Sequence, residues 1–106
     1  MSEMLGYPLV LRLAGTRCLV VGGGAVAARK VRSLVECGAD VVVVAPDVAP
    51  EIEMLAEQGA LSVIRRPFDG GDLESVTLAF ACTNSRAVNS AVAQTARARG
   101  LLVNVS

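Results

Sequence analysis

The chain has 106 residues, enough for one domain with a single core. Hydrophobic residues make up 53% of it, and ten basic residues balance ten acidic ones, so no net charge favours binding to nucleic acid or to an acidic membrane surface. The aromatic residues are Tyr7, Phe68 and Phe80, which leaves few platforms for stacking bases. His is absent, which removes the commonest general base and metal ligand.

Three further features predict a cytoplasmic protein without a membrane span. No run reaches the roughly 18 apolar residues that cross a bilayer, and the first ten residues lack the basic start of a signal peptide. Cys18, Cys37 and Cys82 form no Cys-x-x-Cys pair, so we expect them to be reduced and buried or half-buried, with no metal site. The local basic pairs Arg65/Arg66 and Arg97/Arg99 are interpreted as solvated faces.

The first half of the chain alternates strand and helix patterns. A continuous apolar run predicts a strand over 17–21 that is buried on both faces. The glycines at 22–24 predict a turn, and apolar residues at helical spacing predict a helix over 25–36. A second apolar run predicts a buried strand over 40–45, which Pro46 ends.

The second half continues the alternation. Asp47 is a candidate N-cap for a helix that ends near Gln58. Further patterns predict a strand over 61–64, a loop over 65–72 with room for a short helix near Leu73, a strand over 77–82, a helix over 85–99 and a strand over 101–105. Alternating buried strands and amphipathic helices predict one α/β domain over 1–106, a Rossmann-type doubly wound parallel sheet of about five strands in the order 3-2-1-4-5.

The turn after the first strand carries the chemistry. Gly22-Gly23-Gly24-Ala25-Val26-Ala27 matches the Gly-x-Gly-x-x-Gly pattern with Ala at the last place. Gly22 permits the tight turn, and Gly24 leaves room for a pyrophosphate to approach the backbone. The helix that begins at Ala25-Val26 offers free N–H groups to phosphate. The pattern therefore predicts a dinucleotide site.

The end of the second strand bears on the choice of cofactor. Dinucleotide sites often place an acidic residue there to hold the ribose hydroxyls, but Ala45 and Pro46 occupy that position. Asp47 follows and either reaches the adenosine ribose or only caps the next helix. No Arg or Lys lies between Ala39 and Ile64 to clamp a 2′-phosphate, so NAD is predicted in preference to NADP.

The end of the fourth strand, Cys82-Thr83-Asn84, faces the same edge of the sheet. Thr83 and Asn84 either contact the nicotinamide-side ribose or cap the following helix. The sequence alone leaves both roles open.

Together these residues resemble the N-terminal domain of the siroheme synthase family, the precorrin-2 dehydrogenases and sirohydrochlorin ferrochelatases. The resemblance covers the whole chain, and its most specific piece is Gly-Gly-Gly-x-Val-Ala-x-Arg-Lys at 22–30. The matching segments are Tyr7–Leu9 with Leu11, Val20–Lys30, Val44–Pro46, Pro67–Phe68, Ala81–Asn84, Asn89 and Val103–Val105.

The resemblance implies NAD-dependent oxidation of precorrin-2 to sirohydrochlorin, followed in many members by insertion of Fe²⁺. It implies that backbone near Ala25-Val26 and Pro46-Asp47 holds the dinucleotide. In the family a catalytic aspartate follows shortly after the motif matching Asn104-Val105, so we predict no catalytic residue within the chain, which stops at Ser106. We expect a further segment to complete a homodimer and the tetrapyrrole cleft, and we expect the 106 residues alone not to oxidise precorrin-2.

Two other functions compete with this one. One is a non-enzymatic NAD-sensing regulatory domain, such as those attached to potassium channels. Such domains usually end the second strand with an acidic residue, so Ala45-Pro46 speaks against it. The other is an oligomer-forming module with a vestigial site.

Overall fold

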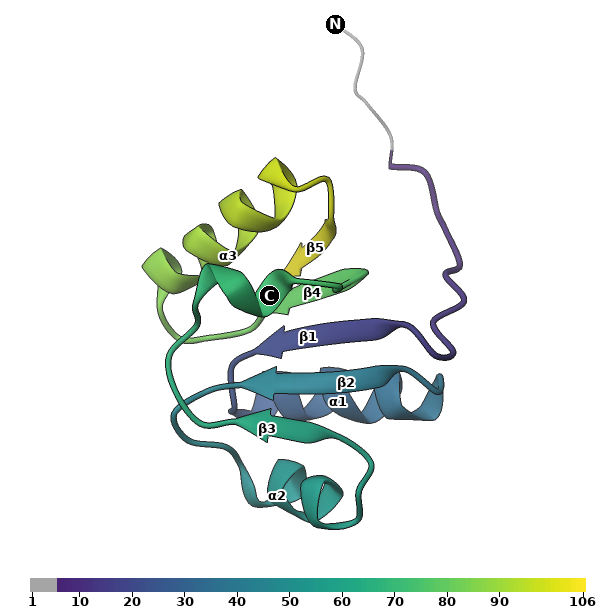
Figure 1. The fold of residues 1–106 in the computed structure, drawn as a ribbon, viewed down its shortest axis with the longest axis vertical. Helices are drawn as coiled ribbons and strands as arrows, with labels where there is room; N and C mark the ends of the chain where they lie inside the picture. The colour runs from purple at the N-terminus through teal and green to yellow at the C-terminus, as the bar shows by residue number, and fades with distance from the viewer. Residues whose placement is uncertain (1–5) are drawn as a thin grey trace, which may run out of the picture.

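The computed structural model describes residues 6–106 and contains one five-stranded sheet in which every neighbouring pair of strands is parallel (Figure 1). The strands are β1 (Arg17–Val21), β2 (Asp40–Val44), β3 (Ser62–Ile64), β4 (Leu78–Ala81) and β5 (Leu102–Val105). Their order across the sheet is β3-β2-β1-β4-β5, which confirms the predicted Rossmann-type topology.

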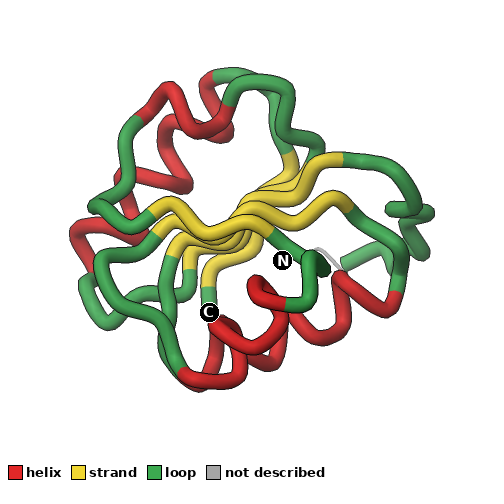
Figure 2. The backbone as a smooth tube through the Cα atoms, turned by 60° about the horizontal axis from the view of Figure 1, so that its bottom comes forward, coloured by secondary structure: helices red, strands yellow, loops and turns green. Residues whose placement is uncertain are grey.

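Helices cover both faces of this sheet, as the view along its edge shows (Figure 2). They are α1 (Ala25–Glu36), α2 (Pro50–Glu57), the short 3₁₀ helix η1 (Gly70–Leu73) and α3 (Arg86–Ala98). The helices α1 and α2 pack on one face, and η1 and α3 pack on the other. In the described part of the chain, no helix is both long and apolar enough to cross a membrane.

The central strand β1 divides the core between the two faces. Cys18 and Val20 point toward α1 and α2, whereas Leu19 and Val21 point toward η1 and α3. All of these side chains are almost fully buried, as expected for a strand covered on both sides. Because β1, β2 and β4 are parallel neighbours, their carboxyl ends lie together at one edge of the sheet. Buried cores on both faces hold these strands in place.

Two expectations were wrong in their details. Asp47 does not cap α2, because that helix begins at Pro50 and its N-cap is Ala49. Proline presets the backbone of a first helical turn, and the Ala49 N–H is already bound to the Gly23 carbonyl at 2.7 Å, so the helix starts later than the acid. Cys18 and Cys82 are buried as predicted, but Cys37 is exposed because it forms the C-terminal end of α1.

Candidate dinucleotide site

A cleft of about 440 Å³ lies across the carboxyl ends of β1, β2 and β4. An adjoining hollow of about 220 Å³ opens over the start of α1 and shares Gly24, Thr83 and Asn84 with it. Between them, these two spaces are lined by every site residue that the sequence predicted: Gly22, Gly24, Ala25, Val26, Ala45, Pro46, Asp47, Thr83 and Asn84. The fold thus brings three segments that are distant in sequence to one edge.

Gly22 is required by the fold itself. Its φ is +132°, a region that favours glycine, and a Cβ there would lie 2.5 Å from the Cys82 carbonyl oxygen. Its N–H donates to the Val44 carbonyl at 3.0 Å. Gly22 therefore lets the chain leave β1 between the ends of its two neighbouring strands.

Gly23 has a structural role that the sequence did not reveal. A Cβ at this position would overlap the Asp47 carbonyl oxygen, so the glycine turn and the loop after β2 are in direct backbone contact. The hydrogen bond from Ala49 N–H to the Gly23 carbonyl fixes the same contact. The only signal in the sequence was a third glycine at a variable position of the motif.

Gly24 differs from both, because no neighbouring atom of the protein requires a glycine there. Its φ is −89°, which any residue adopts, and no atom lies within 4 Å of the place where a Cβ would project. Gly24 is the N-cap of α1, which has no side-chain cap and no acidic residue in its first turn. Free N–H groups and open space at this point fit a pyrophosphate approaching the backbone.

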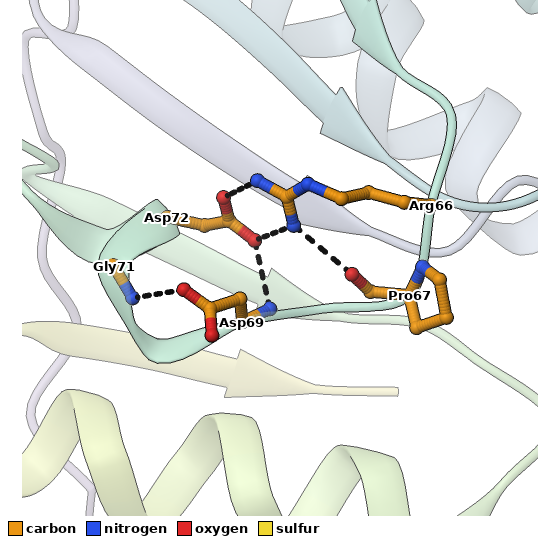
Figure 3. Close-up of polar contacts among 5 residues, drawn as sticks. All are labelled: Arg66, Pro67, Asp69, Gly71 and Asp72. Carbon is orange, nitrogen blue, oxygen red and sulfur yellow. Dashed lines mark hydrogen bonds and ion pairs between the residues drawn. The ribbon is translucent and has the colours of Figure 1, made fainter.

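The other wall of the cleft comes from the loop between β3 and η1. Pro67 and Phe68 line the cleft, and an ion pair behind them orders the loop (Figure 3). Arg66 donates to both oxygens of the Asp72 carboxylate, at 2.6 and 2.9 Å, and also to the Pro67 carbonyl at 3.0 Å. Asp72 in turn accepts the Asp69 N–H at 2.8 Å. The hydrogen bond from Arg66 holds the pKa of Asp72 below its ordinary value.

The turn after β4 is organised by Asn89, a buried polar side chain on α3. Its Oδ1 accepts the Thr83 N–H at 3.0 Å and the Thr83 hydroxyl at 2.7 Å, and its Nδ2 donates to the Thr83 carbonyl at 3.1 Å. Sequence reasoning assigned no role to Asn89. The signal available was a polar residue on the helix face that also carries Val92 and Ala96.

The prediction that Thr83 or Asn84 caps α3 is also wrong. The N-cap is Ser85, whose Oγ accepts the Val88 N–H at 3.2 Å. The neighbouring Cys82 is a buried wall of the cleft, and burial raises the pKa of its thiol. Within residues 6–106, no cluster of three or more His, Cys, Asp or Glu side chains could hold a metal ion.

Comparison with known proteins agrees with this geometry. Residues 9–106 match the family described as "Putative NAD(P)-binding". The chain is 48% identical over 99 residues to a siroheme synthase of Chromobacterium violaceum, and 43% identical over 98 residues to one of Methylococcus capsulatus. These alignments cover 93% and 92% of this chain but only 21% of each relative, so the chain spans about a fifth of their length.

A solved structure gives the same result in three dimensions. The chain superposes on SirC, a precorrin-2 dehydrogenase, with a TM-score of 0.84 and 36% sequence identity. The match covers 93% of this chain and 48% of that one. A glycine turn that fits a pyrophosphate, a cleft at the carboxyl edge and these relatives all agree on a nicotinamide dinucleotide as the class of cofactor. The chain belongs to the NAD(P)-binding family and, within it, to the N-terminal domains of siroheme synthases.

Proposed function

We propose that this chain is the NAD⁺-binding domain of a precorrin-2 dehydrogenase, which oxidises precorrin-2 to sirohydrochlorin in siroheme biosynthesis. The observation that carries the proposal is Gly24, which has open space at its Cβ position and lies at the start of a helix without a side-chain cap, at the edge of the cleft. The substrate in this proposal is taken from the names of two relatives, a precorrin-2 dehydrogenase and a siroheme synthase. The activity belongs to the whole protein, of which such a domain forms one part.

Each segment of the cleft has a defined part in holding the cofactor. The pyrophosphate lies over Gly22 and Gly24 and accepts hydrogen bonds from the N–H groups of Ala25 and Val26. The adenosine lies between two walls of the cleft, Ala45–Asp47 and Pro67–Phe68. The nicotinamide ribose lies at Thr83 and Asn84, and Asn89 holds the backbone of Thr83 in place. Bound NAD⁺ supplies the hydride acceptor of the reaction.

The charges around the cleft support NAD⁺ over NADP⁺. No Arg or Lys is among the residues that line the cleft. On the adenosine side of the cleft, the nearest arginines along the chain are Arg65 and Arg66, and each already pairs with a carboxylate, on Glu53 and Asp72 respectively. Asp47 is exposed at the end of β2, where its carboxylate accepts hydrogen bonds from ribose hydroxyls and repels a 2′-phosphate.

The whole protein has an oligomeric state and a second activity beyond those of this domain. We propose that it works as a homodimer and that a second segment completes the tetrapyrrole cleft. Insertion of Fe²⁺ into sirohydrochlorin is a further activity of the same protein, with the iron as substrate. The name of the relatives, siroheme synthase, supports the insertion of iron, because siroheme is the iron complex of sirohydrochlorin.

The test combines binding with turnover. Calorimetric titration of the chain is expected to show tighter binding of NAD⁺ than of NADP⁺, and anaerobic incubation of the whole protein with precorrin-2 and NAD⁺ is expected to form NADH. Tighter binding of NADP⁺ would overturn the cofactor assignment. NAD⁺ binding without NADH formation would favour the competing function, a regulatory domain that senses the dinucleotide.

A further inference from the structure

A second groove, of about 480 Å³, runs along α3 and meets the cofactor cleft at Thr83 and Asn84. Val105 and Ser106, at the end of β5, line it as well. The remaining lining residues belong to α3: Arg86, Asn89, Ser90, Ala93, Gln94 and Arg97. The spacing of Arg86, Ser90, Ala93, Gln94 and Arg97 places them along one stripe of the helix. No acidic side chain lines this groove, so it is a polar surface with two positive charges.

The position of Arg86 has no explanation within the folded chain. Arg86 is the first residue of α3, where the helix dipole disfavours a cation, and the first turn holds no acidic residue to offset it. Across residues 6–106, neither Arg86 nor Arg97 has a carboxylate within 4.0 Å, a property that they share with Arg12, Arg29 and Arg99, whereas Arg17, Arg32, Arg65 and Arg66 each have one. A charge that costs helix stability and has no internal partner is available for a ligand.

The distance between the two arginines limits what that ligand is. They are eleven residues apart in the helix, which separates their Cα atoms by about 16 Å along its axis. With Cα atoms this far apart along one helix face, the two guanidinium groups suit separate anionic groups of one ligand better than a single carboxylate or phosphate. Arginine binds carboxylates in a bidentate way, and Ser90 and Gln94 offer neutral donors between the two.

We propose that this groove binds the carboxylate side chains of the tetrapyrrole substrate, an inference that rests on the proposed function. The nicotinamide end of the cofactor lies at Thr83 and Asn84 in that proposal, and the substrate must lie against it. The groove begins at those same two residues and carries charge complementary to a polycarboxylate. Arg97 is then a ligand-binding residue and not part of a solvated face.

The test uses uroporphyrin III, a stable tetrapyrrole whose peripheral side chains are all carboxylates, and follows its fluorescence on titration with the NAD⁺-loaded whole protein. Arg86→Gln and Arg97→Gln are each expected to weaken binding about twofold to fivefold, the range for a partly exposed charge pair. Arg99→Gln is the matched control, because it removes a charge just beyond the same helix from a residue that does not line the groove. Coproporphyrin III, with fewer carboxylates, is expected to bind more weakly and to be less sensitive to both groove variants.

Calorimetric titration of NAD⁺ separates this inference from the proposed function. Unchanged NAD⁺ affinity in Arg86→Gln and Arg97→Gln, together with weaker uroporphyrin binding, supports the groove. Normal NAD⁺ binding with no uroporphyrin binding, or with an equal loss in Arg99→Gln, overturns the groove and leaves the proposed function intact. If the wild-type protein fails to bind NAD⁺, the proposed function fails, and titration of the unloaded protein with uroporphyrin decides whether the groove binds polycarboxylates.

Discussion

Gly22, Gly23 and Gly24 are adjacent in sequence but have different neighbours. Gly22 contacts the end of β4 and Gly23 contacts the loop after β2, whereas nothing in the protein approaches the Cβ position of Gly24. The fold therefore leaves no room for a side chain at two of the three glycines, whereas the third, the N-cap of α1, has open space beside it. Substitution at these sites separates stability from binding.

Gly24→Val is expected to leave the fold intact and to remove dinucleotide binding. The free energy of unfolding should change by about 1 kcal/mol or less, the size of a helix-cap effect, since the new side chain enters open space. NAD⁺ affinity should fall at least about 100-fold, or about 2.7 kcal/mol, because that space is where the pyrophosphate lies. Urea unfolding and calorimetry measure the two effects.

Gly23→Ala is the contrasting control, because its methyl group meets the Asp47 carbonyl. It should destabilise the fold by about 1–3 kcal/mol, in the range for overpacking.

The outcome that would contradict the Gly24→Val prediction is an unchanged NAD⁺ affinity in that variant, which would mean that the dinucleotide binds elsewhere.

At the scale of elements, α3 is connected to the cofactor cleft through Asn89. Asn89→Ala removes three hydrogen bonds to Thr83 and leaves buried backbone groups without partners. The expected loss of stability is about 2–4 kcal/mol, with a fall in NAD⁺ affinity because the turn after β4 loses its support.

Val92→Ala provides the matched control for this prediction. Val92 is fully buried on the same helix, so its truncation also costs about 2 kcal/mol but leaves the contacts to Thr83 in place. NAD⁺ affinity should fall in Asn89→Ala only, when both variants are titrated well below their melting temperatures. An equal fall in both would reduce Asn89 to a general stabilising residue.

The loop between β3 and η1 depends on pH through Asp72. Because the folded pKa of Asp72 is lowered, the Arg66–Asp72 pair contributes stability above the ordinary carboxyl pKa of 3.8 and loses it as the pH falls through the lower, folded value. Asp72→Asn should cost about 1 kcal/mol at pH 7, since half of the Arg66 side chain stays solvated. The difference from wild type in urea unfolding should shrink below pH 4, and a difference that is constant down to pH 2 would contradict this account.

At the scale of the whole molecule, binding and folding are linked through the sheet edge. NAD⁺ at about 100 times its dissociation constant should stabilise the native state by about 2.7 kcal/mol, which raises the melting temperature of a domain of this size by roughly 10 °C. Thermal unfolding with and without NAD⁺ measures the shift. Gly24→Val should show no shift under the same conditions, and an equal shift in that variant would place the ligand outside this cleft.

Much of this architecture was predictable from the sequence. Continuous apolar runs separated by helical patterns predict a parallel sheet, and the strand order confirms that prediction. The nine residues predicted to bind the cofactor line two adjoining hollows at one edge of the sheet, and their contacts with a cofactor stay a prediction. The start of α2 was not predictable from Asp47, because it depends on the contact between Ala49 and Gly23 across the sheet edge. Asn89 and Asp72 were missed for a similar reason, since their roles lie in contacts that only the folded chain creates.

The walls of the cleft are joined mainly through backbone atoms. Gly22 N–H binds the Val44 carbonyl, Cys82 N–H binds the Val21 carbonyl, and Ala49 N–H binds the Gly23 carbonyl. Side chains at Ala25, Val26 and Ala45 contribute none of these bonds, so their replacement by residues of similar size leaves the cleft unaltered. The shape of the cleft therefore tolerates such replacements. A change of cofactor preference would act instead on the one acidic side chain that lines the cleft, Asp47, which we propose to repel a 2′-phosphate.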